Sequence, residues 1–194
     1  MKTTRIEAFS DAVIAIAMTI MVLELKVPHG ADFESLRPVL PIFLSYVLSF
    51  IYLGIYWNNH HHMLQATHSV NGTVLWANLH LLFWLSLIPF GTAWMGENHF
   101  DTLPTAVYGV ILLCAAIAYT ILQTSIVRHH NNENKLLKEA IGNDLKGKVS
   151  MAFYVISIPS AFLSPLISCA IYVLVAAIWL VPDPRIEKRY NNSE

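Results

Sequence analysis

An acidic residue inside an apolar stretch is the first feature of this sequence that could do chemistry. Asp11 follows Ser10 near the start of an apolar segment that runs from about residue 6 to residue 26. An ionisable group inside a membrane costs free energy unless it is paired, so Asp11 is a candidate for contact with a transported ion or proton. A structural role is the alternative, because a carboxylate can also accept hydrogen bonds and hold helices together. We favour the structural role.

Histidines gather near the middle of the chain, and imidazole is a common ligand of zinc. His60, His61 and His62 are consecutive, and His68 and His80 follow them. Three consecutive residues of a helix point in different directions, and the H-x-x-x-H spacing that places two ligands on one face does not occur there. The sequence therefore predicts no metal site, although metal binding by these histidines stays open as an alternative.

We instead predict a buried polar network that stabilises the contact between the first three apolar segments. Polar side chains inside apolar helices find partners in one another, because lipid offers none. A histidine in such a network would change its charge in the physiological pH range, which predicts pH-sensitive behaviour. The residues expected to contribute are Ser10 or Asp11, Trp57, His60 or His61, and Asn78, and we assign Arg5 and Phe9 of the first segment to the same network.

The composition is that of a membrane protein. Of 194 residues, 55% are hydrophobic and 13% are charged, whereas a soluble domain carries roughly 25% charged residues. The formal net charge of −1 gives no indication of a nucleic-acid partner. No G-x-S-x-G, H-E-x-x-H or nucleotide-binding loop occurs, so we expect neither enzymatic activity nor a cofactor.

Apolar segments divide the chain into six candidate transmembrane helices. The last two are shorter than the usual ~20 residues and are separated at Ser164-Pro165, which favours a helical hairpin. We expect one domain over residues 1–190, with a disordered tail at 191–194. A signal peptide is the alternative for the first segment, but Asp11 interrupts it. The segments lie near residues 6–26, 39–63, 71–95, 103–127, 149–163 and 166–182.

The distribution of Lys and Arg predicts the orientation. With six helices and the N-terminus inside, ten of the twelve basic residues lie on the cytoplasmic side, and the loops at 96–102 and 164–165 contain none. The positive-inside rule therefore places both termini in the cytoplasm. The polar region 128–148 carries several of these residues and an apolar stripe, so it is either a short interfacial helix or a solvated linker.

The first apolar segment has two different faces when it is drawn as a helix. At ~100° per residue, Asp11 points roughly 140° away from Ile16. One face carries the polar pair at 10–11, and the other carries mostly aliphatic side chains. Spacing alone favours lipid contact or helix packing for the aliphatic face. That face contains Arg5, Phe9, Ala12, Ile16, Thr19, Leu23 and Lys26.

Several motifs together resemble one known family. R-x-x-x-F-S-D spans residues 5–11, W-x-x-H-H spans 57–61, N-L lies at 78–79, and P-F-x-T spans 89–92. This combination closely resembles the endosomal and lysosomal potassium channel family called transmembrane protein 175. The chain is similar to a prokaryotic, single-repeat member, which implies a multi-pass protein of a prokaryotic plasma membrane.

The resemblance implies a homotetramer in which the first helix of each subunit surrounds a central pore. The family's constriction positions correspond to Ile16, Ile20 and Leu23, and Thr19 corresponds to a threonine implicated in selectivity. The resemblance also implies that no carbonyl filter is used, and no T-V-G-Y-G-like string occurs here. The expected partners are further copies of the chain, the lipid bilayer and permeating K⁺.

A constriction of this kind would act on ions through its narrowness and its apolar lining. A ring of Ile16 side chains would be narrow and apolar enough to exclude water, which closes the path to ions. Potassium holds its hydration water less tightly than sodium, so a partly dehydrating constriction with Thr19 beside it predicts moderate potassium selectivity. Arg5 would repel cations if it were free. We therefore expect Arg5 to pair with Asp11 of a neighbouring subunit or with the second-helix polar cluster.

A proton-coupled or metal-ion transporter that uses Asp11 and the histidine cluster is the alternative function. Proton relays usually need several carboxylates, and the second to sixth segments supply no further one. The paired, interrupted half-repeats of many transporters are also absent from the sequence pattern. Flux measurements separate the two, because a channel current reverses near the potassium equilibrium potential.

Overall fold

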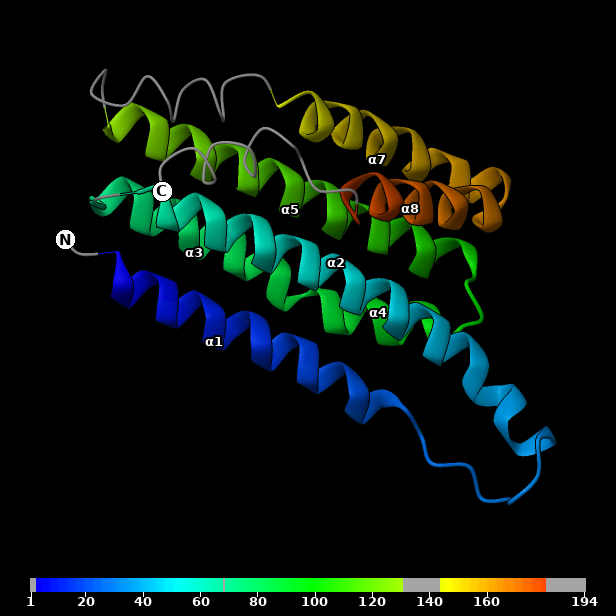
Figure 1. Cartoon of the computed structure of the whole chain (residues 1–194). Coiled ribbons are helices and arrows are strands. Elements are labelled where there is room, and N and C mark those ends of the chain that lie inside the picture. The colour runs from blue at the N-terminus through cyan, green and yellow to red at the C-terminus, as the bar shows by residue number, and fades with distance from the viewer. Residues whose placement is uncertain (1–2, 68, 131–143, 181–194) are drawn as a thin grey trace.

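The computed structural model describes residues 3–67, 69–130 and 144–180, and every regular element within them is helical (Figure 1). The apolar segments expected from the sequence thus form helices, and a loop of residues 25–33 separates η1 from η2. In chain order the elements are α1 (Thr4–Ile20), η1 (Met21–Glu24), η2 (Glu34–Val39), α2 (Leu40–Gln65), α3 (Gly72–Ser86), α4 (Ile88–Glu97), α5 (Thr102–His129), α7 (Leu145–Leu163) and α8 (Pro165–Leu180).

Within the described residues, four helical stretches are long and apolar enough to cross a membrane. They are Thr4–Glu24, Glu34–Gln65, Gly72–Glu97 and Thr102–His129, with mean hydropathies from 1.5 to 2.2. These stretches correspond to the first four segments expected from the sequence, with ends that differ by one or a few residues. A bilayer requires that every backbone polar group be satisfied internally, which is why such segments are helical.

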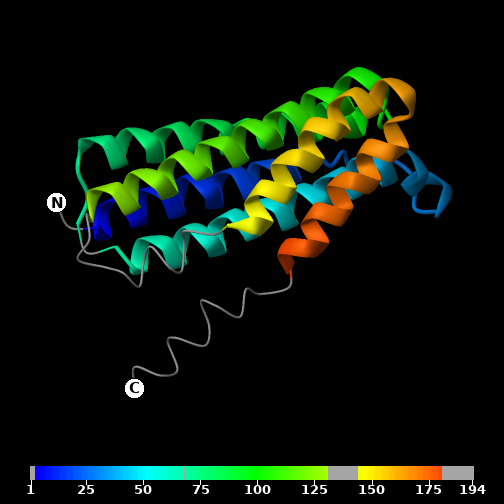
Figure 2. The same ribbon diagram turned by 90° about the horizontal axis from the view of Figure 1, so that it is seen from above.

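The last two apolar segments form a helical hairpin, as the sequence predicts. The chain is extended at Ser164, and α8 begins at Pro165, where a missing backbone N–H costs nothing. The 16-residue α8 is shorter than the four spanning stretches. Figure 2 shows α7 and α8 running back along each other beside the rest of the bundle.

Two of the expected spans are not single straight helices. The α-helix of the first span ends at Ile20 and tightens into η1, and Leu25 is extended, so the helix is shorter than the expected 6–26. The third span breaks at Leu87 into α3 and α4. Pro89 explains this break, because its ring clashes with the preceding turn and it has no N–H to donate.

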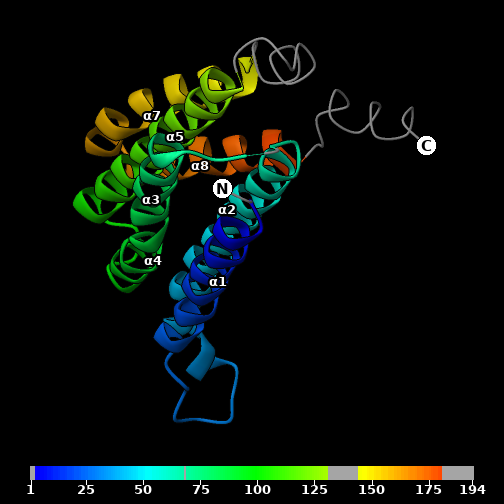
Figure 3. The same ribbon diagram turned by 90° about the vertical axis from the view of Figure 1, so that its left-hand side faces the viewer.

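The helices lie roughly along one another, with α1 at one edge of the bundle and the α7–α8 hairpin at the opposite edge (Figures 1 and 3). α1 packs on α2 and α3, and α5 packs on α3 and α7. The buried face of α1 repeats every three or four residues, as expected for one side of a helix. It consists of Ile6, Ser10, Ile14 and Ala17, with Met21 of η1 continuing it.

Hydrogen bonds of buried hydroxyl groups cross the apolar core between α2, α4, α5 and α8. Thr92 donates to Ser49 at 2.6 Å, and Ser49 lies 2.8 Å from the Tyr108 hydroxyl. Separately, the Tyr52 hydroxyl donates to the Tyr172 carbonyl oxygen at 2.6 Å. These four hydroxyls are tolerated in the core because each has a hydrogen-bond partner. These contacts fix the mutual register of helices that are far apart in sequence.

Two expectations lie outside the described residues. The choice between an interfacial helix and a linker at 128–148 falls mostly on residues 131–143, and the expected disordered tail is 191–194.

Candidate pore-lining helix and its polar network

The aliphatic stripe of the first span is uncovered in the single chain. Ile16 is 56% exposed, Ile20 43% and Leu23 78%, and Thr19 between them is also exposed. The opposite face of α1 is buried against α2 and α3. The two-faced helix expected from the sequence is therefore present, with its aliphatic face directed away from the bundle.

Thr19 is held by its own helix. Its hydroxyl lies 3.0 Å from the carbonyl oxygen of Ala15 and 3.0 Å from that of Ile16, and it donates its hydrogen to them. Since the hydrogen is directed back along the helix, the oxygen lone pairs are what the side chain offers to its surroundings. An oxygen lone pair is the group that a dehydrating cation requires.

An open groove of about 690 Å³ runs along the stripe between α1 and α4. Ile16 and Ile20 form one wall, and Phe90 and Trp94 form the other. Pro89 also lines this groove, so the kink between α3 and α4 shapes the wall opposite the stripe. The groove carries two acidic residues, Glu24 and Glu97.

An ion pair joins the end of the first span to the end of α4. The Lys26 Nζ lies 2.7 Å from Glu97 Oε1. This contact raises the pKa of Lys26 above its ordinary value, first through the hydrogen bond to Glu97 and then through the charge of that carboxylate. Both side chains are open to solvent, where an ion pair adds little stability, so the contact positions the loop more than it stabilises the fold.

Asp11 accepts a hydrogen bond from the second span. The Trp57 indole Nε1 donates to Asp11 Oδ1 at 3.0 Å. The carboxylate therefore links α1 to α2 from the side of α1 that does not carry Ile16.

A second polar link runs through three buried side chains. Asn78 Nδ2 donates to Ser10 Oγ at 2.9 Å, and the Ser10 hydroxyl donates to the Ile6 carbonyl oxygen at 2.7 Å. His60 Nε2 lies 2.7 Å from Asn78 Oδ1. Since the amide oxygen can only accept, His60 Nε2 must carry a hydrogen. These bonds thus fix which way the Asn78 amide is turned and which nitrogen of the His60 ring carries the hydrogen. They also link α1, α2 and α3.

His61 makes a different contact, which sequence reasoning missed. Its Nδ1 lies 3.2 Å from Glu7 Oε1, its ring stacks on Trp57 at 5.8 Å and 19°, and its Nε2 lies 2.8 Å from Gln65 Nε2. Glu7 stands four residues before Asp11, so both carboxylates lie on the side of α1 that faces α2. The four-residue spacing from Asp11 could have identified Glu7 as a second carboxylate on this face of α1.

Two residues expected in the network lie outside it. Phe9 is 52% exposed on the stripe side of α1. Arg5 is exposed, and within the described part of the chain it makes no hydrogen bond or ion pair. The expected contact of Arg5 with the second-helix polar cluster is therefore not made within one subunit, because the side chain lies on the stripe face.

The described histidines do not converge on one point, and His68 lies outside the described residues. His60 bonds Asn78, His61 faces Glu7, and His80 accepts from Trp84 Nε1 at 3.0 Å. Among residues 3–67, 69–130 and 144–180, no group of three or more His, Cys, Asp or Glu side chains is placed to hold a metal ion.

Comparison with known proteins identifies the family. Residues 5–89, which cover all but the first residue of α1 and the whole of α2 and α3, match the family of the endosomal/lysosomal potassium channel TMEM175. The chain is 58% identical over 184 residues to a potassium channel of Chryseobacterium sp. (strain P1-3), covering 95% of each chain. It is 35% identical over 127 residues to a potassium channel of Chamaesiphon minutus, covering 61% of this chain and 63% of that one.

A solved structure supports the same assignment. The crystal structure of a lysosomal potassium-selective channel TMEM175 homolog from Chamaesiphon minutus superposes with a TM-score of 0.75 at 26% identity. The match covers 92% of this chain and 96% of that chain. The likeness thus extends over most of the chain, and the chain belongs to the TMEM175 family.

Proposed function

We propose that this protein is a moderately selective potassium channel whose pore is lined by the exposed stripe of α1. Relatives that match over most of the chain are named potassium channels. The observation that carries the proposal is the uncovered stripe of Ile16, Thr19, Ile20 and Leu23 on a helix whose other face is fixed by hydrogen bonds. A single chain leaves this face without a partner.

Four copies of the chain would bring their α1 stripes together around one axis. Stacked rings of Ile16, Ile20 and Leu23 would form a constriction too apolar to hold water, so ions pass only when the helices rotate or splay. The groove between α1 and α4 leaves space in which such a movement of the Ile16 and Ile20 side chains can occur.

Selectivity in this proposal comes from dehydration. Thr19 lies between Ile16 and Ile20 and directs oxygen lone pairs outward, because its hydrogen is donated to the helix backbone. An ion that sheds part of its water at Ile16 meets these oxygens next. Few fixed oxygens replace the hydration shell, so potassium is favoured over sodium only moderately.

The wider architecture follows from the same proposal. The channel is a homotetramer of one six-helix domain per subunit, with both termini in the cytoplasm and its place in a prokaryotic plasma membrane. The basic residues of the sequence support this orientation. The protein needs no cofactor, and K⁺ is the permeating ion rather than a resident one.

A channel accounts for the polar residues better than a transporter does. A proton-coupled or metal-ion transporter would use Asp11 and the histidines as exchanging sites. Asp11 instead accepts from Trp57, and His60 is buried against Asn78. Contacts of this kind support a role in holding α1 while its other face meets the ions.

Reconstitution into liposomes tests the proposal. With potassium concentrated inside, the protein should release K⁺ faster than Na⁺, and the current in planar bilayers should reverse near the potassium equilibrium potential. Mass measurement of the detergent-solubilised protein should give four chains. A reversal potential that follows the proton gradient would instead require the transporter.

A further inference from the structure

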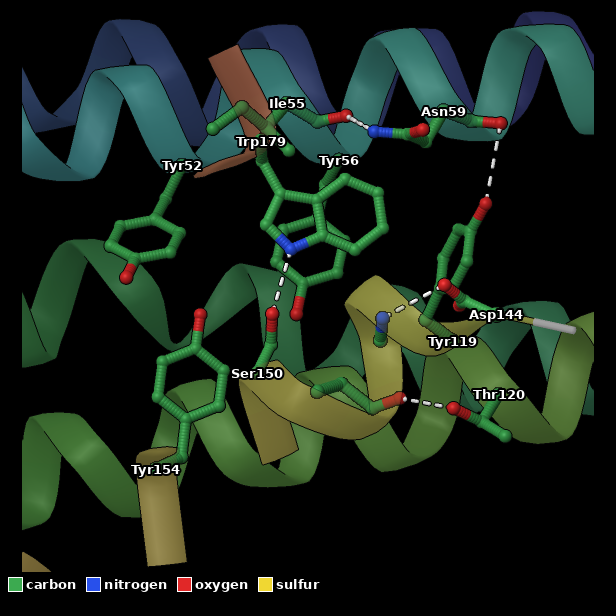
Figure 4. A pocket seen from close by; sticks show the side chains of 12 residues that line it. Tyr52, Ile55, Tyr56, Asn59, Tyr119, Thr120, Asp144, Ser150, Tyr154 and Trp179 are labelled. Carbon is green, nitrogen blue, oxygen red and sulfur yellow. Dashed lines mark hydrogen bonds between the residues drawn. The ribbon is translucent and has the colours of Figure 1, made fainter. Parts of the chain in front are cut away.

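A cavity lined by aromatic rings lies apart from the α1 stripe, between α2, α5, α7 and α8 (Figure 4). Its lining comes from the C-terminal half of α2, the C-terminal half of α5, the start of α7 and the end of α8. None of the residues assigned to the pore or to the α1 network contributes to it. The rings and the one carboxylate that line it are Tyr52, Tyr56, Tyr119, Tyr154, Trp179 and Asp144.

The rings are set at angles, so they form walls rather than a stack. Tyr56 and Tyr119 meet edge to face, with centroids 6.1 Å apart and planes at 65°. Tyr52 and Tyr154 lie 6.4 Å apart at 53°. In an edge-to-face pair the contact covers one face of one ring, so the ring that contributes its edge keeps both faces out of the contact; aromatic faces carry negative electrostatic potential.

The polar ends of several of these rings are engaged elsewhere. Trp179 Nε1 donates to Ser150 Oγ at 2.8 Å, and the Tyr52 hydroxyl donates to the Tyr172 carbonyl oxygen at 2.6 Å. The Tyr119 hydroxyl points toward the Asn59 carbonyl oxygen at 3.5 Å. Ring faces, rather than hydroxyls or N–H groups, are therefore the main surface that these side chains present to the cavity.

Asp144 gives the cavity its charge. It lies near Tyr119 and is the one charged residue among the described residues that line the space (Figure 4). Its Oδ1 accepts from the Gly147 N–H at 2.8 Å, which caps the start of α7. A carboxylate beside several aromatic faces favours a positively charged occupant and disfavours an anion.

We propose that this aromatic cavity binds a small alkylammonium cation, up to the size of a trimethylammonium head. Aromatic faces attract such cations because the charge is spread over methyl groups that fit against the rings, and this is how proteins recognise quaternary ammonium ions. The cavity has about 40 Å³ of room for water, which corresponds to roughly three molecules at ~10–15 Å³ each. A head group of a few heavy atoms is of comparable size.

Two sources could supply this chemistry: a free amine such as choline, or the head group of a choline lipid. Binding is measured by calorimetry on the full-length protein in a detergent that has no choline head. Choline is the probe, and 3,3-dimethylbutanol, which has the same shape without the charge, is the matched control. Choline should bind saturably and the neutral alcohol should bind at least roughly tenfold more weakly.

Nanodiscs distinguish the two sources. If lipid head groups occupy the cavity, added choline binds in nanodiscs of phosphatidylglycerol and loses at least roughly tenfold in apparent affinity in nanodiscs of phosphatidylcholine. If a free amine is the occupant, choline binds equally in both. Either result supports the aromatic cavity as an alkylammonium site.

Variants assign the binding to this cavity. Tyr119→Leu removes the ring and should weaken choline binding by roughly tenfold, whereas Tyr119→Phe keeps the ring and should bind like the wild type. Asp144→Asn keeps the cap of α7 and removes the charge, so it should weaken binding without loss of folded protein. It therefore tests the site even if Tyr119→Leu does not fold.

Three outcomes would overturn the proposal. They are no saturable choline binding in the choline-free detergent, equal binding of choline and the neutral alcohol, and wild-type choline affinity in folded Asp144→Asn. Binding is measured without ion flux, so the proposal can fail while the channel function holds, and the channel function can fail while choline still binds.

Discussion

Thr19 donates its hydrogen to its own helix, which fixes what it can offer to a passing ion. The bonds to Ala15 and Ile16 leave only the lone pairs directed outward. Thr19→Val keeps the shape and removes the oxygen, so it should lower the ratio of K⁺ to Na⁺ permeability by roughly severalfold. Thr19→Ser keeps the oxygen and should preserve the ratio. Bi-ionic reversal potentials in planar bilayers measure it, and an unchanged ratio in Thr19→Val would exclude Thr19 from selectivity.

Asp11 stabilises the subunit through Trp57 rather than through an ion. Asp11→Ala leaves the Trp57 N–H without its acceptor and should cost about 1 kcal/mol of stability. Asp11→Asn retains an oxygen acceptor and should cost less. Thermal unfolding in detergent and the yield of the assembled protein measure both variants. If Asp11→Ala is as stable as the wild type but loses ion flux, the carboxylate acts on ions instead.

The contact between His61 and Glu7 predicts that these two side chains stabilise the packing of α1 on α2. His61 Nδ1 lies 3.2 Å from Glu7 Oε1, and the other neighbours of His61 are the Gln65 amide, the Trp57 ring and His62. His61→Ala removes the polar contact and the stacking on Trp57 together, so it should cost about 1 kcal/mol of stability. Glu7→Gln keeps an oxygen that can accept a hydrogen bond and should cost less. Thermal unfolding in detergent measures both variants, and wild-type stability in His61→Ala would exclude a role for this pair.

At the scale of the helices, packing depends on close approach between α5 and α8. A Cβ at Gly109 would collide with the hydroxyl of Tyr172, which is buried and donates to the Thr105 carbonyl oxygen. Gly109→Ala should therefore cost about 1–3 kcal/mol of stability. Gly54→Ala on α2 is the matched control, because nothing lies within 4 Å of its Cβ position and alanine favours a helix. Equal melting temperatures for the two variants would contradict this account.

The sequence allowed most of the elements to be predicted, because apolar segments of that length have few alternatives to helices in lipid. The hairpin could be predicted from Ser164-Pro165, since proline is favoured at the first position of a helix. The break at Leu87 is also due to a proline, but Pro89 lies inside an unbroken apolar run that hides it. The tightening into η1 has no marker in the residue types of Met21–Glu24, so it could not be predicted.

The polar contacts could be predicted as a group but not as individual pairs. Ser10, Asn78 and His60 meet because each is a polar side chain within an apolar helix. Which of three consecutive histidines meets Asn78 depends on the rotation of α2 to within a fraction of a turn, and hydropathy does not fix that rotation. The same reason hid the partners of Ser49, which are Thr92 and Tyr108.

At the scale of the whole molecule, the helix that we propose lines the pore, α1, lies at the edge of the described bundle (Figure 1). Its buried face is fixed by hydrogen bonds to α2 and α3, while its aliphatic face has no cover within the subunit. We propose that further copies of the chain cover this face and bring the stripes of Ile16, Thr19, Ile20 and Leu23 together at the axis of symmetry. Arg5 and Phe9 lie on this face, so their partners are expected across the subunit boundary.

The measurement that tests this claim most directly is ion flux through liposomes that contain Ile16→Asn. A polar ring at this position would hold water in the constriction, so K⁺ leak should rise severalfold over the wild type. Ile117→Asn places the same side chain on an exposed position of α5 and controls for general damage to the bundle. A rise in Ile16→Asn without one in Ile117→Asn is the predicted result. Wild-type flux in folded Ile16→Asn would contradict the account.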